Sequence, residues 1–335
     1  MKIKENISLK TYNTFGVEAT ASYFSEFNCV EDLAYLYSLY PNYPKLILGE
    51  GSNILFTKPY EGLVLHNCIK GIKLEEESAD EVIVSAASGE RWHDLVMYCV
   101  EHGWAGIENL SLIPGTVGAA PVQNIGAYGV ELKDVFHSLE AYDVQKGILI
   151  QMNVSDCAFG YRTSIFKTTG KDKFVIVKVS LRLKKNFEPN ISYGAIRDTL
   201  AQMQVGPSIK SVSMAVIKIR NSKLPDPAKI GNAGSFFKNP EISAHHFENI
   251  KQEFKDVVSY PAPEGRIKIP AAWLIEKCGW KGKRIGDAGV HQHQALVLVN
   301  YGSAKGMDIL ELAHQIKESV QNKFGITLEE EVNVL

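Results

Sequence analysis

The sequence of 335 residues lacks the features that mark several large classes of protein. No apolar run approaches the length of about 18 residues that a membrane-spanning helix needs. Residues 1–6 are polar, unlike the start of a secretory signal. The formal net charge is −2 without a basic block, which argues against a nucleic-acid footprint. We therefore expect a cytoplasmic protein that contacts neither nucleic acid nor membrane, and we expect it to be a monomer.

Cysteine is scarce, and the metal-binding spacings are missing. The five cysteines stand singly and no CxxC pair occurs. An odd number of scattered cysteines argues against both a disulfide framework and a zinc site. His291 and His293 would share one face of a strand, but the sequence offers no third ligand beside them. We therefore expect no metal.

The usual nucleotide-binding loops are also absent. Gly49-Glu50-Gly51 has no third glycine in register, so the Rossmann fingerprint fails, and residues 279–284 lack the Walker A spacing. Two other glycine-rich stretches are present instead, and their backbone N–H groups could cradle a pyrophosphate. Each stretch alone could equally be a set of tight turns, but two of them favour a dinucleotide. Their candidate residues are Gly49, Glu50, Gly51, Ser52 and Asn53 in the first, and Ile113, Pro114, Gly115, Thr116, Gly118, Ala119, Asn124, Gly126, Ala127, Tyr128 and Gly129 in the second.

Hydrophobic periodicity predicts an α+β protein. Apolar residues at helical spacing predict helices, and short β-branched runs predict strands. Gly103 should end the helix that is predicted at residues 90–100. The helices are expected at residues 90–100, 193–203, 212–220, 271–278 and 309–324. The strands are expected at residues 46–48, 63–68, 82–86, 139–144, 148–152, 173–183, 295–300 and 327–334.

Three polar residues stand in settings that are unusual for their type. Arg162 lies among aromatic and apolar neighbours, where a guanidinium needs a carboxylate partner from the protein or from a ligand. Ser235 follows small residues and precedes two phenylalanines; without a paired base it suits proton donation better than nucleophilic attack. Taken alone, that segment is better explained as a polar turn ahead of an apolar strand. On the last predicted strand, Glu329 and Glu331 share a face, and either could point inward.

Taken together and in this order, these segments resemble the UDP-N-acetylenolpyruvoylglucosamine reductase family, which belongs to the vanillyl-alcohol oxidase superfamily of flavoproteins. The resemblance runs from Asn13 to Glu331. It implies a PCMH-type FAD-binding region of two α/β lobes, at residues 1–66 and 67–205. A substrate domain of α+β type would follow at residues 207–324, and a terminal strand at residues 325–335 would join the first lobe.

The resemblance also implies a reaction and its residues. NADPH would reduce FAD, and FAD would reduce the enolpyruvyl ether of UDP-N-acetylglucosamine to UDP-N-acetylmuramate. Ser235 would donate the proton, while Arg162 and Glu331 would stabilise the enolate. Tyr193 matches the tyrosine of the family's longer-loop subgroup. The other implied substrate contacts are Lys223, Asn239 and Gln294, and the two glycine-rich stretches match the FAD cradle.

Two alternatives remain at this point. One is a different flavoenzyme of the same superfamily, which would need another set of proton-handling residues. The other is a nucleotide-binding or regulatory protein without catalytic activity. Bleaching of a bound flavin by NADPH, and its re-oxidation by the enolpyruvyl sugar nucleotide, would separate them.

Overall fold

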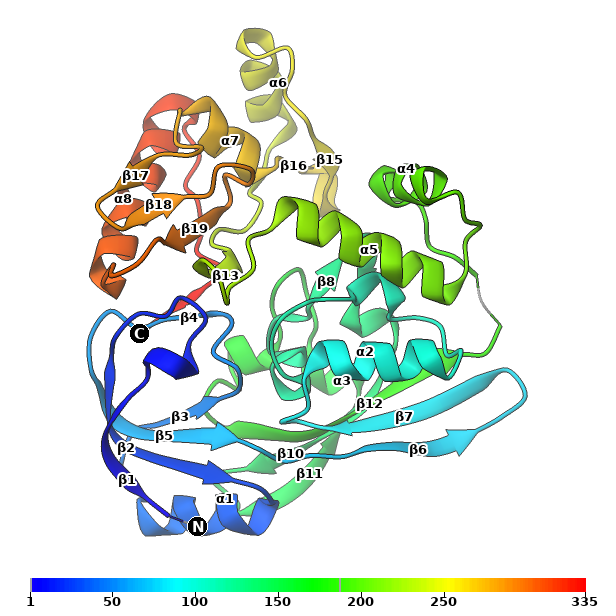
Figure 1. Ribbon diagram of the computed structural model, residues 1–335, viewed down its shortest axis with the longest axis vertical. Helices are drawn as coiled ribbons and strands as arrows, with labels where there is room; N and C mark the ends of the chain where they lie inside the picture. The colour runs from blue at the N-terminus through cyan, green and yellow to red at the C-terminus, as the bar shows by residue number, and fades with distance from the viewer. Residues whose placement is uncertain (1, 187) are drawn as a thin grey trace. The chain divides into compact units, whose positions relative to one another are not determined.

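The computed structural model describes residues 2–186 and 188–335 (Figure 1); Met1 and Phe187, which fall within the two predicted lobes, lie outside the described residues. The chain divides into two compact units. Unit 1 comprises Met1–Ile7, Ala21–Glu50 and Glu61–Ser222, and unit 2 comprises Ser8–Thr20, Gly51–Tyr60 and Lys223–Leu335. Two short N-terminal segments therefore group with the C-terminal part of the chain.

The first sheet of unit 1 has the strand order β1-β2-β5-β3. Its strands are β1 (Lys4–Ser8), β2 (Thr20–Phe27), β3 (Lys45–Leu48) and β5 (Tyr60–Asn67). Strands β3 and β5 run parallel. Helix α1 (Val30–Leu39) buries Leu33 and Leu36 in one cluster with side chains of β2 and β5. Apolar burial on one face of this helix thus fixes it against the sheet.

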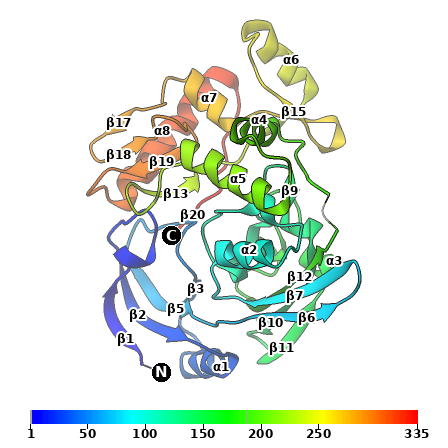
Figure 2. The same ribbon diagram turned by 45° about the vertical axis from the view of Figure 1, so that its right-hand side comes forward.

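A second, antiparallel sheet of unit 1 has the order β11-β10-β12-β7-β6. Its strands are β6 (Ile72–Glu77), β7 (Glu81–Ala87), β10 (Phe136–Asp143), β11 (Ile148–Met152) and β12 (Phe174–Lys184). Helix α2 (Trp92–Glu101) lies over one face in both views (Figures 1 and 2), and α3 (Val154–Cys157) contacts β10 and β11. Gly103 follows α2 with φ +73°, so its predicted role in ending the helix is confirmed.

Residues 106–131 of unit 1 are largely loop. Strands β8 (Gly126–Ala127) and β9 (Val130–Glu131) form a short hairpin, and several single 3₁₀ turns surround it. Helices α4 (Gly194–Met203) and α5 (Ile209–Lys223) pack their apolar faces together. The predicted helices at 193–203 and 212–220 are therefore confirmed, the second with three residues more at each end.

Unit 2 is built on an antiparallel sheet of order β13-β19-β18-β17. Helix α8 (Gly306–Phe324) packs against β18, β19 and α7 (Ala271–Lys277). The sheet strands are β13 (Gly231–Ser235), β17 (Arg284–Ile285), β18 (Ala288–Val290) and β19 (Val297–Asn300). Helix α6 (Ala244–Glu253) and the small sheet of β14 (Glu241–Ile242), β15 (Tyr260–Pro261) and β16 (Ile267–Lys268) complete the unit.

The predicted terminal strand at 327–334 is mostly wrong. Only β20 (Asn333–Val334) is a strand, paired in parallel with β4 (Ile54–Leu55), and Glu330 forms a single bridge to Phe237. Burial alternates from Ile326 to Glu329, which imitates a strand. A strand also needs a neighbouring backbone along its whole length. This segment pairs with another backbone only at Glu330 and at β20. The predicted alternation of Glu329, Glu330 and Glu331 across a strand therefore fails.

Across residues 2–186 and 188–335, no helix combines the length and the apolar composition needed to cross a membrane.

Candidate active site

A β-bulge positions Ser235 at the end of the edge strand β13. Asn232 pairs with Val299 and Ser235 with Val297, so β13 contains one residue more than its partner over this interval. Gly234 takes φ +70°, and its N–H donates to Oδ1 of Asn232 at 2.9 Å. Such bulges redirect a side chain at the edge of a sheet. The small residues before Ser235 thus form a bulge, and this bulge sets the direction of the Ser235 side chain.

The two phenylalanines after Ser235 anchor the strand. Both rings are fully buried, with centroids 5.1 Å apart. The backbone of Phe236 also binds on two sides: its N–H donates to the carbonyl of Leu296 at 2.8 Å, and its carbonyl accepts from the N–H of Glu331 at 2.8 Å. The structure therefore places the backbone of Glu331 beside Phe236, the residue that follows Ser235, within unit 2.

A second contact holds the backbone of Glu331. Nδ2 of Asn53 donates to the Glu331 carbonyl at 3.2 Å, and the Asn53 carbonyl accepts from the backbone N–H of Asn333 at 3.0 Å. Asn53 was predicted as a cofactor contact in the first glycine-rich stretch. In the structure its amide and its carbonyl fasten the C-terminal segment beside β4.

The three consecutive glutamates near the C-terminus have different surroundings. The Glu329 side chain is 74% exposed and pairs with Lys238 at 3.0 Å. The Glu330 carboxylate pairs with Lys317 of α8 at 2.7 Å. Glu331 is half-buried. Of the two glutamates that the sequence left as candidates for an inward carboxylate, Glu329 faces solvent.

Arg162 lies in unit 1, in a tight turn closed by hydrogen bonds between Gly160 and Thr163. Its φ of +52° is unusual for a residue with a side chain. Such conformations cost on the order of 1–3 kcal/mol and cluster at functional sites. Nη2 of Arg162 donates to the Gly126 carbonyl at 2.6 Å, and a Cβ at Gly126 would lie 3.2 Å from Nη1. The glycine thus makes room for the guanidinium.

A second arginine, which the sequence did not single out, lies near the first. Arg220 of α5 forms a hydrogen bond with Tyr128, and its Nε donates to the Leu112 carbonyl at 3.2 Å. Burial lowers the pKa of Arg220, Tyr128 raises it, and the charge of Arg162 lowers it again. The two guanidinium groups therefore repel each other electrostatically within unit 1. Their combined positive charge favours the binding of an anion there.

Tyr193, the predicted substrate-covering tyrosine, lies beside the same group. It precedes α4, its side chain is exposed, and its ring meets that of Tyr128 edge-on at 5.2 Å. Tyr128 itself has φ +52°. Burial raises the pKa of the Tyr128 phenol, so it stays protonated and can donate at neutral pH. Tyr193, Tyr128 and Arg220 thus form one contact chain.

Gly49 and Glu50, at the start of the first glycine-rich stretch, meet the second stretch within unit 1. A Cβ at Gly49 would lie 2.4 Å from Oγ1 of Thr116, so only glycine permits this approach. The Glu50 carboxylate accepts from the N–H of Gly115 at 2.8 Å and pairs with Arg91 at 2.7 Å. Side-by-side placement of the two stretches is what a shared cofactor requires.

Much of the polar backbone in the second stretch is used inside the protein. The N–H groups of Val117 and Gly118 donate to the carbonyls of Glu90 and Ser88. Asn124 is fully buried, with φ +44°; its Nδ2 donates to Glu131 and to the Gly160 carbonyl, each at 3.1 Å. These contacts hold the loop in one conformation. They assign Asn124 a bracing role beside the turn that carries Arg162.

The predicted substrate contacts in the C-terminal half lie on separate elements. Lys223 is the exposed last residue of α5. Oδ1 of Asn239 accepts from the N–H of Ala271 at 2.9 Å and so caps α7. Gln294 is half-buried just before β19. His291 and His293 do not lie on a strand as predicted, because β18 ends at Val290.

Comparisons with known proteins agree along the whole chain. An FAD binding domain family matches residues 25–153, and the C-terminal domain of UDP-N-acetylenolpyruvoylglucosamine reductase matches residues 226–335. The UDP-N-acetylenolpyruvoylglucosamine reductase of Flavobacterium johnsoniae is 48% identical, with 100% of both chains covered. That of Amoebophilus asiaticus is 49% identical with the same coverage. The crystal structure of the Thermus caldophilus enzyme, UDP-N-acetylenolpyruvylglucosamine reductase, has a TM-score of 0.71 at 24% identity and covers 100% of this chain and 99% of its own. The predicted fold class is thereby confirmed.

Proposed function

Because the chain belongs to the UDP-N-acetylenolpyruvoylglucosamine reductase family, we propose that Ser235, Arg162 and Glu331 carry out the proton and charge handling of its reaction. The protein is an FAD-dependent oxidoreductase of peptidoglycan precursor synthesis. Its substrate is the enolpyruvyl ether of UDP-N-acetylglucosamine, its product UDP-N-acetylmuramate, and its electron donor NADPH. FAD, held by the two glycine-rich stretches, would supply the transfer of hydride from NADPH to a vinyl carbon of the substrate.

Hydride addition leaves negative charge on an enolate, which Arg162 and Glu331 stabilise. A fixed donor aimed at developing charge contributes roughly 2.7–4 kcal/mol in a dry site. Arg162 suits this role because its turn and its bond to Gly126 hold the guanidinium in place. A protonated Glu331 would add a second donor, and its backbone is fastened to Phe236 and Asn53.

Ser235 donates the proton to the other vinyl carbon. A positioned proton donor adds about 10²–10⁴-fold to a rate. A hydroxyl is a weak acid, but the enolate carbon is a strong base. The observation that carries the proposal is the link through Phe236, which fixes Glu331 one residue away from Ser235.

The cofactor and substrate contacts complete the proposal. The loops around Gly49 and Gly115–Gly129 fit FAD because they are glycine-rich, adjacent and held in one conformation by Glu50 and Asn124. Tyr193 closes over the substrate, as the matching tyrosine does in the longer-loop subgroup of the family, to which we assign this chain. Lys223, Asn239 and Gln294 supply further polar contacts. We also propose a cytoplasmic monomer; light scattering on the purified enzyme tests the monomer.

The Ser235→Ala variant tests the proton donor. Reduction of the flavin by NADPH should stay near the wild-type rate, while re-oxidation by the enolpyruvyl sugar nucleotide should slow by about 10²–10⁴-fold. Stopped-flow absorbance of the flavin measures both half-reactions. Ser303→Ala, which alters an exposed serine of the same unit, should change neither. Equal losses in the two half-reactions would contradict the role.

A further inference from the structure

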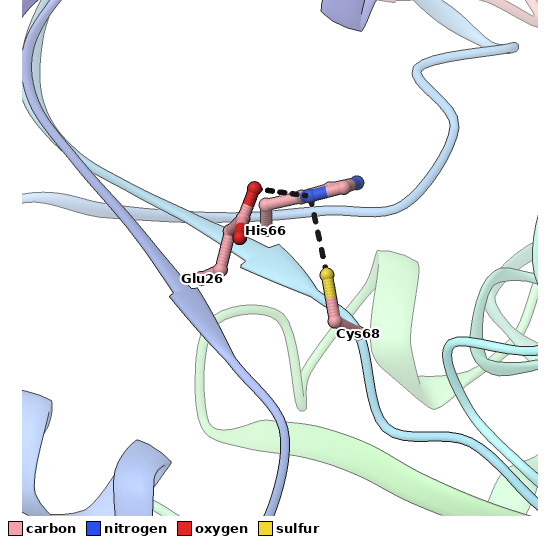
Figure 3. A group of neighbouring side chains, drawn as sticks. All are labelled: Glu26, His66 and Cys68. Carbon is pink, nitrogen blue, oxygen red and sulfur yellow. Dashed lines mark hydrogen bonds and ion pairs between the residues drawn. The ribbon is translucent and has the colours of Figure 1, made fainter. Parts of the chain in front are cut away.

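Three side chains with metal-binding atoms meet at the end of the first sheet of unit 1. Glu26 comes from β2, His66 from β5, and Cys68 follows β5 directly (Figure 3). Nδ1 of His66 lies 3.4 Å from Sγ of Cys68 and 3.8 Å from Oε1 of Glu26. All three ligand atoms lie within 4.8 Å of one another. The Cys68 N–H donates to the carbonyl of Phe27 at 2.9 Å, which fixes the thiol's backbone to β2.

These separations suit a tetrahedral ion. Zinc bonds of about 2.0–2.3 Å place neighbouring ligand atoms about 3.3–3.8 Å apart. The contact from Nδ1 of His66 to Sγ of Cys68 already falls in that range, whereas the Glu26 carboxylate lies a few tenths of an ångström too far from Nδ1. The carboxylate also has to approach Cys68, by about 1 Å at most. Rotation of the Glu26 side chain, which is 46% exposed, can supply that movement.

The same ring nitrogen of His66 faces both Cys68 and Glu26, and this favours a metal-binding site over a catalytic triad. In a triad the nucleophile meets one ring nitrogen of histidine and the carboxylate meets the other. Here Cys68 and Glu26 both approach Nδ1 of His66.

We propose that Glu26, His66 and Cys68 bind one Zn²⁺ ion, with water in the fourth position. A thiolate, an imidazole and a carboxylate form a ligand set typical of zinc. The half-exposed Glu26 and the partly exposed His66 leave a path for the ion from solvent. The ion would tie β2 to the end of β5. The sequence motifs did not reveal this set, because Glu26 lies 40 residues before His66 along the chain.

Cobalt binding to the FAD-loaded enzyme tests the site. After treatment with a chelator, the wild type should take up one equivalent of Co²⁺ with a thiolate-to-cobalt absorption, and Zn²⁺ should abolish that absorption. Cys68→Ser should lose the band. His66→Ala and Glu26→Gln should each weaken uptake at least about tenfold, since even outer-shell changes cost about 10–100-fold in affinity.

Matched variants separate this site from other thiols and imidazoles. Cys278→Ser changes a half-buried cysteine of unit 2, and His293→Ala changes the exposed member of the pair His291 and His293. Both should keep the absorption and the affinity. Thermal unfolding of each variant in chelator verifies that it folds. A thiolate band that survives Cys68→Ser, or a folded wild type that takes up neither Co²⁺ nor Zn²⁺, would overturn the proposal; Glu26→Gln, at an exposed side chain, repeats the test if Cys68→Ser fails to fold.

Discussion

At the scale of single residues, neighbours in sequence acquire different roles from their surroundings. Glu329, Glu330 and Glu331 are chemically identical, yet the first two pair with Lys238 and Lys317. An exposed ion pair of the Glu329 kind contributes about 0–1 kcal/mol to stability. Glu331 is half-buried and has its backbone fixed by Phe236 and Asn53. We propose Glu331 over Glu329 as the catalytic glutamate because Glu329 faces solvent and the backbone of Glu331 is fixed.

Replacement of Glu331 or Glu329 by glutamine tests which of the two carboxylates acts in catalysis. Glu331→Gln should lower turnover by about 10²-fold or more, because a charge-stabilising donor worth roughly 2.7–4 kcal/mol is disturbed. Glu329→Gln, two residues away and facing solvent, should stay within about twofold of the wild type. Steady-state kcat with NADPH and the enolpyruvyl sugar nucleotide measures both. The reverse order would show that Glu329 is the acting residue.

At the scale of elements, buried polar side chains hold the glycine-rich loops that have no regular structure. The 3₁₀ turn Glu108–Leu110 is fully buried, and Oε2 of Glu108 accepts from the Gly106 N–H at 2.7 Å. Nδ2 of Asn109 donates to the carbonyls of Tyr128 and Asn190, each at 2.9 Å. Ser111 bonds to Ser213 of α5 at 2.8 Å. Hydrogen bonds from side chains thus satisfy backbone groups that would bond to other backbone groups in a helix or sheet.

Glu108 makes this element sensitive to pH. Burial raises its pKa, against the opposing effect of its backbone donors. The folded state therefore keeps the proton over a range in which the unfolded chain has lost it. The stability that this proton contributes is complete below the unfolded pKa of about 4.3 and is lost as pH rises through the folded value, by at most about 1.4 kcal/mol per pH unit.

The Glu108→Gln variant should remove that dependence, because it keeps the acceptor oxygen without the charge. Its free energy of unfolding should gain on the wild type as pH rises from about 4 towards 7. Denaturant unfolding at several pH values measures the difference. Glu101→Gln, on the exposed end of α2, serves as the control and should show a flat difference. A flat difference for Glu108→Gln as well would contradict the raised pKa.

At the scale of the whole molecule, the cofactor should stabilise the folded chain. A ligand that binds only the folded state adds about 2.7 kcal/mol at 100 times its Kd. FAD should therefore raise the thermal midpoint of the apoprotein. Gly49→Ala should reduce that rise and the bound flavin, because its Cβ would meet Thr116 at 2.4 Å. Gly194→Ala, where the space is open, should behave as the wild type; an equal shift in both variants would contradict the cradle.

The sequence predicted most elements because their patterns are local. Helices α2, α4, α5, α7 and α8 follow from apolar spacing and glycine stops, and Gly103 acts as expected. The terminal strand failed, since alternation from Ile326 to Glu329 records burial and not a pairing partner. Arg220 carried no signal in the sequence, because nothing local distinguishes it from other helical arginines. Its significance comes from Tyr128 and Arg162.

The sequence alone determined the family, the order of the motifs and the residue types that its chemistry needs, because these depend on neighbours along the chain. Only the tertiary structure decided which groups meet. It joined Gly49 to Thr116, tied Glu331 to Phe236, and gathered Glu26, His66 and Cys68 at one end of the first sheet. The physical reason is that charge pairing, burial and metal geometry act through space over a few ångströms, whatever the separation in sequence.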